Sequence, residues 1–187
     1  DLGAEVRVII TSGGREFVSE LSLQTVSKNK VHDNLWDKEA ELAMGHIELA
    51  KWADAVIIAP ASANTIARLC HGKADDLLST VILATNASIL IAPSMNQQMF
   101  ASKAIKENLK ILNNRGVITI DPGFGEQACG DVGEGRLAEP EEIARQVATI
   151  FSNSALSGKK VLITIGGTIE AIDPVRYISN HSSGKMG

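Results

Sequence analysis

Cysteine and aromatic residues are scarce in this chain, and long apolar runs are missing. The 187 residues include two cysteines, Cys70 and Cys129, and aromatic side chains make up 4%. With so few cysteines and no secretory signal pattern, a structural disulfide is not expected. No apolar run approaches the roughly 18 residues that a membrane-spanning helix needs, so we expect no membrane segment and a cytoplasmic location.

Basic clusters with interleaved aromatic residues are also missing. The formal net charge is -4, which gives no reason to expect nucleic acid as a partner. Hydrophobic residues make up 44% of the chain and charged residues 21%, as is typical of a globular protein. This length suffices for one ordinary α/β domain with a short extension.

Apolar runs of strand length alternate along the chain with segments of helical periodicity. The run AVIIA at 55–59 shows no polar alternation, which favours a strand covered on both faces. The alternation predicts a three-layer α/β fold with a mostly parallel sheet. We expect further strands at 6–10, 88–92 and 117–120, helices at 17–26, 39–52, 64–70, 75–84, 98–113 and 141–151, and connecting structure at 31–37.

Two predicted strands end in the same way, with alanine and proline followed by small polar residues. The segments are 59–62 (APAS) and 92–96 (APSMN). Ligands of such sheets bind at the carboxyl ends of the strands, so this pattern predicts a shared ligand edge. Small side chains there admit a flat ligand, and the polar groups of Ser62, Asn64 and Thr65 can hydrogen-bond it.

The glycine content and the composition change in the second half of the chain. Residues 121–136 (DPGFGEQACGDVGEGR) contain five glycines, so we expect a mobile loop or flap there. We divide the chain into a first domain at 1–151, a linker at 152–160 and the start of a second α/β domain at 161–187. A strand at 161–165 leads there into Gly166-Gly167-Thr168, which either cradles a phosphate or forms a tight turn.

Several side chains are candidates for chemistry, and for some of them a structural role is the alternative. Cys129 lies in the glycine-rich loop, where a thiol suggests proton donation or covalent chemistry. His46 is either a surface or capping histidine or a catalytic one. Asn96 either caps the following helix or faces a ligand. Cys70 and His71 match no zinc spacing, and we interpret Cys70 as a small buried hydrophobe at a helix end.

Four motifs in order resemble the homo-oligomeric flavin-containing cysteine decarboxylases. They are the segment around His46, PASANT at 60–65, PSMNQQM at 93–99 and ACGDVGEGR at 128–136. The tail at 166–176 and 180–187 is similar to the start of phosphopantothenate-cysteine ligase. Together the two parts resemble the bifunctional decarboxylase–ligase family of coenzyme A biosynthesis. Phe100 stands where a larger aromatic residue is common in the family.

The resemblance implies a flavodoxin-like or Rossmann-like domain that binds FMN and assembles into trimers or trimer-based dodecamers, with flavin near subunit contacts. The implied reaction converts 4'-phosphopantothenoylcysteine to 4'-phosphopantetheine. A redox cofactor is needed because oxidation of the thiol-bearing carbon to a thioaldehyde provides the electron sink for loss of carbon dioxide. A full-length chain is also expected to ligate 4'-phosphopantothenate to cysteine with CTP and Mg2+.

The resemblance also implies roles for individual residues. His46 is the base or an orienting group, Asn96 binds the substrate carboxylate, Cys129 donates a proton and Met99 lines the substrate pocket. No metal site is expected in this part. The implied flavin contacts are Thr11, Ser12, Pro60, Ala61, Ser62, Asn64, Thr65, Pro93 and Met95, and the ligase-like positions are Arg176, Asn180 and Lys185.

Two other functions stay open. A decarboxylase of the same fold could act on the C-terminal cysteine of a peptide, although the ligase-like tail argues against it. A non-catalytic, flavin-binding regulatory subunit is the second alternative, and the joint presence of His46, Asn96 and Cys129 argues against that. Family members normally have a strand and a glycine-rich loop before the position of Asp1 and a ligase domain beyond Gly187, so we expect a chain truncated at both ends.

Overall fold

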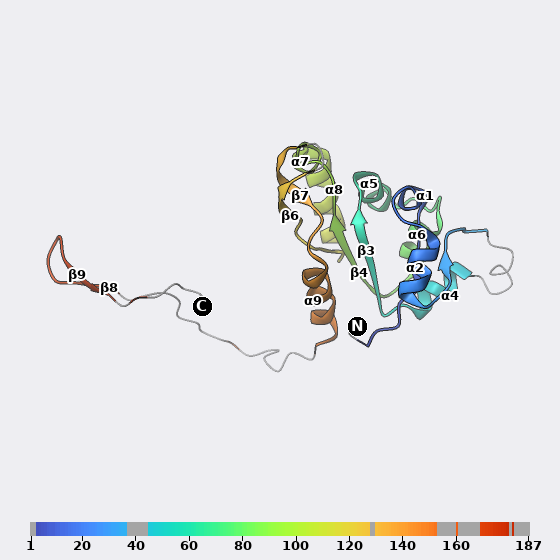
Figure 1. Ribbon diagram of the computed structural model, residues 1–187, viewed down its shortest axis with the longest axis horizontal. Helices are drawn as coiled ribbons and strands as arrows, with labels where there is room; N and C mark the ends of the chain where they lie inside the picture. The colour runs from blue at the N-terminus through green and yellow to red at the C-terminus, as the bar shows by residue number, and fades with distance from the viewer. Residues whose placement is uncertain are drawn as a thin grey trace. The chain divides into compact units, whose positions relative to one another are not determined.

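The computed structural model describes residues 3–36, 45–127, 130–152, 160, 169–179 and 181. The chain divides into two compact units, Asp1–Phe151 and Ser152–Gly187. The first unit contains a parallel sheet with helices on both faces (Figure 1). This arrangement confirms the predicted α/β class.

The main sheet of the first unit has three parallel strands in the order β3-β4-β5. These strands are β3 (Ala55–Ala61), β4 (Ser88–Pro93) and β5 (Ile118–Thr119). The chain crosses from β3 to β4 through α5 (Ala63–Cys70) and α6 (Leu77–Ala84), and from β4 to β5 through α7 (Gln97–Ala101) and α8 (Lys103–Asn114). Parallel strands require such crossovers.

Successive residues of β4 point to opposite faces of the sheet and pack in different apolar clusters. Ile91 lies in the cluster with Leu69 of α5 and Leu109 of α8, whereas Leu90 lies in the cluster that Val147 of α9 (Pro140–Phe151) joins. Leu90 and Ile91 are both fully buried, and each such side chain contributes roughly 1.5–3 kcal/mol by leaving water. The three layers therefore follow from an apolar strand with successive side chains on opposite faces.

A second, smaller parallel sheet precedes the main one. It pairs β1 (Val8–Ile9) with β2 (Val31–His32), so the expectation of purely connecting structure at 31–37 is wrong at its start. The helix expected at 17–26 is observed as α2 (Glu20–Ser27), and a separate short helix, α1 (Ser12–Arg15), precedes the expected range. The Thr11 hydroxyl caps α1 and the Ser19 hydroxyl caps α2, each by accepting a hydrogen bond from a backbone N–H of the first turn.

A crevice of about 570 Å³ separates these two sheets. Its lining includes Ile9 of β1, Val56 and Ile57 of β3, and Trp52 at the end of α4 (Gly45–Trp52). In the described part of the chain β1 pairs only with β2, and β3 only with β4. Ile57 is 43% exposed beside the crevice, so the prediction that both faces of 55–59 are covered is wrong there.

Two further expectations need correction in the second half of the unit. The helix expected at 98–113 is divided at Ser102, which ends α7 and caps α8 with its hydroxyl. The segment at 121–136 contains an antiparallel ribbon of β6 (Gly123–Glu126) and β7 (Val132–Arg136). Glycine lowers strand propensity, which is why composition alone indicated a loop.

The described part of the second unit is a hairpin of β8 (Ile169–Ala171) and β9 (Tyr177–Ser179). Backbone N–H groups of Val175 and Arg176 donate to the Asp173 carboxylate at 2.9 and 2.7 Å, and the Arg176 Nε donates at 2.6 Å. These bonds hold the pKa of Asp173 below its ordinary value, and the bond from the Val175 N–H has the largest effect. The strand expected at 161–165 and Gly166-Gly167-Thr168 lie outside the described residues.

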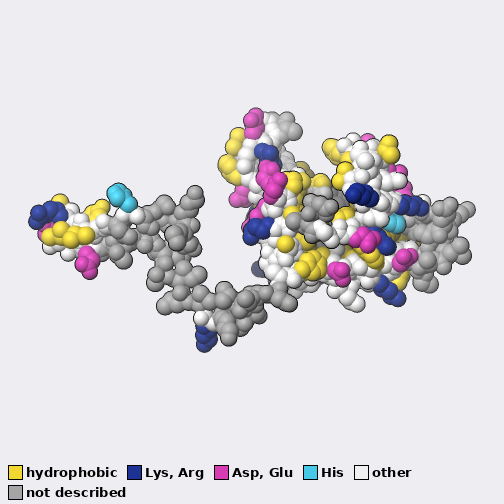
Figure 2. Space-filling model, turned by 60° about the horizontal axis from the view of Figure 1, so that its bottom comes forward, with side chains coloured by type: hydrophobic (Ala, Val, Ile, Leu, Met, Phe, Trp, Pro, Cys, Tyr) yellow, Lys and Arg dark blue, Asp and Glu magenta, His cyan; other side chains and the backbone are white. Residues whose placement is uncertain are grey.

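Charge on the surface of the first unit is mixed. Figure 2 shows acidic and basic side chains interspersed over one face, with apolar side chains between them. Among the described residues, no helix has the length and apolar character required to cross a membrane.

Candidate functional site

The carboxyl ends of β3 and β4 lie side by side, as the two Ala-Pro patterns predict. Ala61 is registered with Pro93, and the Ser94 N–H donates to the Ala61 carbonyl oxygen at 3.1 Å. The register shifts between Ile58 and Ala61, because β3 takes three residues over the stretch in which β4 takes two. This bulge lets β3 continue through Pro60, two residues further than predicted.

Hydroxyl groups lie where the chain leaves β3 and, in the smaller sheet, β1. The Ser62 hydroxyl caps α5 by accepting from the Thr65 N–H at 3.2 Å, and the Ser62 and Thr65 hydroxyl oxygens are 3.1 Å apart. Asn64 is exposed. The Thr11 hydroxyl caps α1 by accepting from the Gly14 N–H at 3.2 Å, and the exposed Ser12 is the first residue of that helix.

The segment after β4 is joined to the glycine-rich ribbon. The Met95 N–H donates to the Gly135 carbonyl oxygen at 2.9 Å. A methyl group at Gly135 would overlap the Met95 carbonyl oxygen, and one at Gly133 would overlap the Gln97 side chain. Glycines in β7 therefore permit the backbone of this strand to approach the start of α7 closely.

Asn96 has two hydrogen bonds that orient its carboxamide. Its Oδ1 accepts from the Gln98 N–H at 2.8 Å and caps α7, and its Nδ2 donates to Asp131 Oδ2 at 3.1 Å. The capping alternative for Asn96 is thus observed. Because the oxygen serves the cap, the donor end of the amide is directed to the ribbon.

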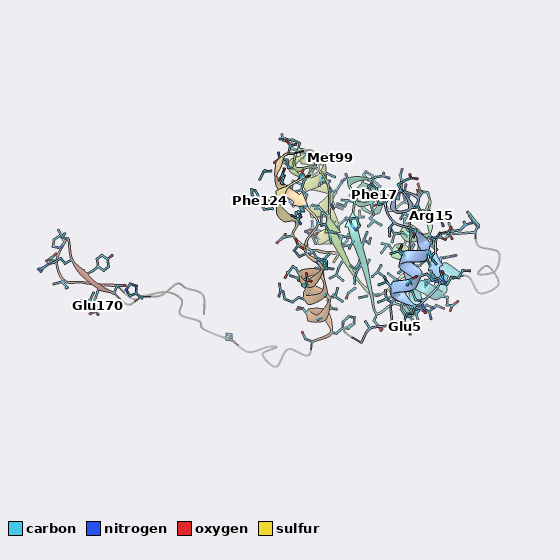
Figure 3. The ribbon with its side chains drawn as sticks, viewed as in Figure 1. Glu5, Arg15, Phe17, Met99, Phe124 and Glu170 are labelled. Atoms are coloured by element: carbon cyan, nitrogen blue, oxygen red, sulfur yellow. The ribbon has the colours of Figure 1, made fainter. Side chains whose placement is uncertain are left out.

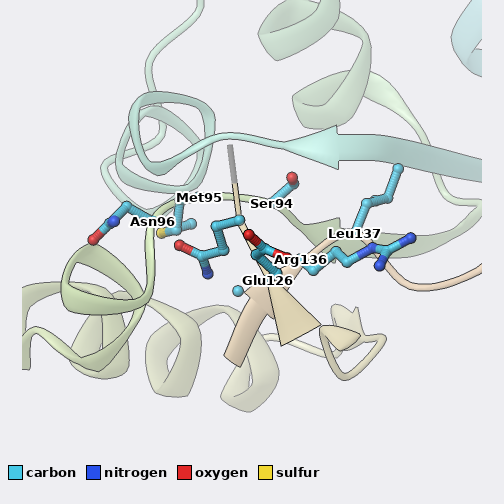
Figure 4. Close-up of a pocket in the computed structure, with 8 residues that line it drawn as sticks. Ser94, Met95, Asn96, Glu126, Arg136 and Leu137 are labelled. Atoms are coloured by element: carbon cyan, nitrogen blue, oxygen red, sulfur yellow. The ribbon is translucent and has the colours of Figure 1, made fainter. Parts of the chain in front are cut away.

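Met95, Asn96 and Gly135 help to line a cavity of about 580 Å³ (Figure 4). Sequence reasoning identified Met95 and Asn96 as site residues, but it missed the other lining residues. The contacts across the cavity join residues about thirty or more positions apart, which a local pattern does not reveal. The lining residues are Ser94, Met95, Asn96, Glu126, Gln127, Gly135, Arg136 and Leu137.

Other predicted contact residues have different surroundings. Ala61 and Pro93 have fully buried side chains, whereas Pro60 is exposed. Met99 on α7 is 48% exposed, and Figure 3 shows it on the same part of the unit as Phe124 of the ribbon. The cavity itself is not lined by Met99.

His46 lies in α4, in a different part of the unit from α7, where Asn96 is the cap (Figure 1). Within one chain the structure therefore does not bring these two candidates together. Cys70 is buried at the end of α5, as predicted. Arg176 belongs to the second unit. Cys129, Asn180 and Lys185 lie outside the described residues.

A parallel sheet with small residues at its carboxyl edge and a cavity beside that edge defines a ligand-binding protein of the three-layer α/β class. The chain belongs to the Flavoprotein family, whose model matches residues 1–152. The model of the DNA/pantothenate metabolism flavoprotein C-terminal domain matches residues 156–187.

Curated relatives include the coenzyme A biosynthesis bifunctional protein CoaBC of Haemophilus influenzae, which is 60% identical over 98% of this chain, and that of Bacillus subtilis, 45% identical over 99%. The chain spans 46% of the length of each.

Two solved structures are similar to the chain. A mutant PPC decarboxylase complexed with pantothenoylaminoethenethiol has a TM-score of 0.68 and 34% identity, over 79% of this chain and 84% of its own. The FMN binding protein AtHal3 has a TM-score of 0.66 and 33% identity, over 81% and 84%.

Proposed function

We propose that the chain carries the FMN-dependent carboxy-lyase part of a bifunctional coenzyme A biosynthesis protein, which converts 4'-phosphopantothenoylcysteine to 4'-phosphopantetheine. The observation that carries this proposal is the hydrogen bond from Asn96 to Asp131. It joins the PSMN motif, whose Asn96 lines the cavity, to Asp131 of the ACGD motif. Identity of 60% to a CoaBC protein and a PPC decarboxylase neighbour support the reaction.

The residues at the strand ends fit a flavin. The hydroxyls of Ser62 and Thr65 and the exposed Asn64 offer polar contacts beside small side chains, and the start of α5 provides N–H groups suited to polar oxygens. Thr11 and Ser12 occupy the corresponding place at the start of α1. When bound, FMN supplies the two-electron oxidation and later reduction that the substrate's thiol-bearing carbon requires.

The remaining roles belong to side chains of the protein. Asn96, whose carboxamide is oriented by its hydrogen bond to Asp131, is proposed to bind the substrate carboxylate. Cys129 is proposed to donate the final proton, and Met99 to line the pocket. His46 is proposed as base or orienting group; in a homo-oligomer it and Asn96 can come from different subunits.

We also propose that the full-length protein is a trimer or dodecamer located in the cytoplasm. Exposed apolar side chains on and before α2 support association: Phe17 is 93% exposed, Val26 83% and Leu21 73%. Analytical ultracentrifugation of the natural-length protein measures the assembly, and a monomer at all concentrations contradicts it. In such a protein CTP, Mg2+ and the ligase-like Arg176, Asn180 and Lys185 belong to the second reaction.

The test is an anaerobic absorbance titration of the natural-length protein with 4'-phosphopantothenoylcysteine, together with carbon dioxide release. We expect substrate to perturb the flavin spectrum and carbon dioxide to form. Cys129→Ser should still release carbon dioxide but stop before the final reduction, and His46→Asn should lose the first step. Cys70→Ala, which removes the buried thiol, is the matched control and should turn over normally.

Other outcomes of this test would support one of the alternative functions. A protein that cannot be reconstituted with FMN would reject the decarboxylase and favour a partner-binding role. Release of carbon dioxide from a peptide ending in cysteine, without turnover of the small substrate, would favour the peptide decarboxylase. Normal turnover of Cys129→Ser would remove the donor role from that thiol.

A further inference from the structure

Gln127, the residue directly after β6, connects three segments around the cavity. Its Oε1 accepts from the Gln97 backbone N–H at 2.9 Å, and its Nε2 donates to the Glu134 carbonyl oxygen at 3.3 Å. Gln97 is the first residue of α7, so the glutamine satisfies an N–H group for which the helix has no acceptor. One side chain thus joins β6, β7 and the start of α7.

The backbone of Gln127 closes the turn between β6 and β7. Its N–H donates to the Asp131 carbonyl oxygen at 2.8 Å, and its carbonyl oxygen accepts from the Gly130 N–H at 2.8 Å. Asp131, at the far side of this turn, is the residue whose carboxylate accepts from Asn96. The position of Asp131 against Asn96 therefore depends on both the backbone and the side chain of Gln127.

The site requires the length and both polar groups of a glutamine. An acceptor must reach the start of α7 while a donor reaches the β7 backbone. Gly135 has no side chain next to the Gln127 amide, and a methyl group there would lie 3.1 Å from Nε2. Methionine has a similar length but cannot donate, and alanine reaches neither partner.

We propose that Gln127 is a positioning residue for substrate recognition: it holds the ribbon turn against α7 so that Asp131 fixes the Asn96 carboxamide toward the substrate carboxylate. Gln127 acts through Asn96. The inference rests on the proposed decarboxylase function and assigns a residue outside its catalytic set. It predicts that loss of Gln127 affects ligands with the carboxylate more than ligands without it.

The experiment compares dissociation constants for 4'-phosphopantothenoylcysteine and for 4'-phosphopantetheine, which lacks the carboxylate. It uses the FMN-loaded, natural-length protein with His46→Asn as the parent background, because this change is expected to stop turnover and so to keep the substrate intact during the titration. Flavin absorbance under anaerobic conditions provides the readout. For Gln127→Met we expect the substrate constant to rise about tenfold, the loss typical of one hydrogen bond to a charged group. The constant for 4'-phosphopantetheine should change less than about twofold.

Gln24→Met, at an exposed glutamine of α2, is the matched control and should bind both ligands as the parent does. Gln127→Ala is the second variant, used if the methionine protein does not fold, with the same expected selectivity. Equal weakening for both ligands, no weakening for either, or failure of both variants to fold while the control folds would overturn the positioning role. Failure of the proposed function is seen separately, as a protein with His46 intact that does not release carbon dioxide.

Discussion

At the scale of single residues, the close approach of β7 to the start of α7 depends on missing side chains. Gly135 has a φ of +129°, and a methyl group on it would meet the Met95 carbonyl oxygen. At Gly135, a side chain would therefore cause both backbone strain and overlap with the Met95 carbonyl oxygen. The site tolerates no larger residue there without moving the ribbon away from Asn96.

We expect Gly135→Ala to destabilise the protein by roughly 2–4 kcal/mol, because a positive φ costs about 1–2 kcal/mol and the overlap adds to it. Gly116→Ala is the control, because Gly116 also has a positive φ, +89°, but open space around it. Urea unfolding of both variants measures the difference. An equal loss in the two proteins would show that overlap with Met95 contributes nothing.

Asn96 illustrates which features of the candidate site can be predicted from the sequence. The PSMN pattern after a buried strand predicted a polar side chain at the carboxyl edge, and Asn96 does line the cavity. Its partner Asp131 lies 35 positions away, and Gln127 meets Gln97 across 30. Such pairs result from the path of the ribbon, which no local pattern contains.

At the scale of elements, α6 begins with a charged capping box. The Asp76 carboxylate accepts from the Ser79 N–H at 2.7 Å and from the Ser79 hydroxyl at 2.6 Å, and it pairs with Arg68. Burial alone raises the pKa of Asp76, but the Ser79 hydrogen bonds and the Arg68 guanidinium outweigh it, so the pKa is lowered from 3.8. The ionised form is therefore the one that stabilises the fold.

A lowered pKa in the folded state gives stability that is present above the unfolded value and lost as pH falls through the folded value. We expect Asp76→Asn to be less stable than the parent at pH 7, with the difference shrinking as pH falls below about 4. Asp76→Ala should lose about 0.5–2 kcal/mol at pH 7, as is usual for a helix cap.

Thermal unfolding of the Asp76 variants at several pH values provides the measurement. Asp75→Asn is the control, because Asp75 contacts the same Arg68 at 3.4 Å from an exposed position. It should change stability by less than about 0.5 kcal/mol. A constant gap between Asp76→Asn and the parent from pH 7 to pH 3 would contradict the charged cap.

Elements differ in how well a sequence predicts them. The strands β3 and β4 follow from unbroken apolar runs, and α6 from an aspartate before an apolar segment. The division at Ser102 was missed because Phe100 and Ile105 flank it within one apparent helical pattern. The strand β2 has two residues, too few for any periodicity.

At the scale of the whole molecule, separate apolar clusters hold the two sheets of the first unit. Leu49 of α4 and Leu77 of α6 form a cluster on which Ile9 of the first sheet packs. Leu109 of α8 belongs to the cluster under β3 and β4. The smaller sheet is thus joined to the rest through α4 and α6, a connection that the chain order did not reveal.

We expect Leu49→Ala and Leu109→Ala each to cost roughly 2–5 kcal/mol, because both remove a buried leucine. Their local effects should differ. Leu49→Ala should accelerate amide hydrogen exchange most at Val8–Ile10, and Leu109→Ala most in β4. Hydrogen exchange followed by mass spectrometry tests this, and identical patterns in the two variants would mean that both sheets open as one unit.

The crevice between the sheets also affects how the chain behaves in concentrated solution. An open strand edge beside apolar side chains is a template for pairing with another chain. Arg7 lines that crevice, stacks on Trp52 at 4.3 Å and lies 3.6 Å from Glu5 and 3.8 Å from Glu48. Charge beside an open edge opposes aggregation. Removal of the Arg7 charge is therefore expected to raise light scattering with increasing protein concentration.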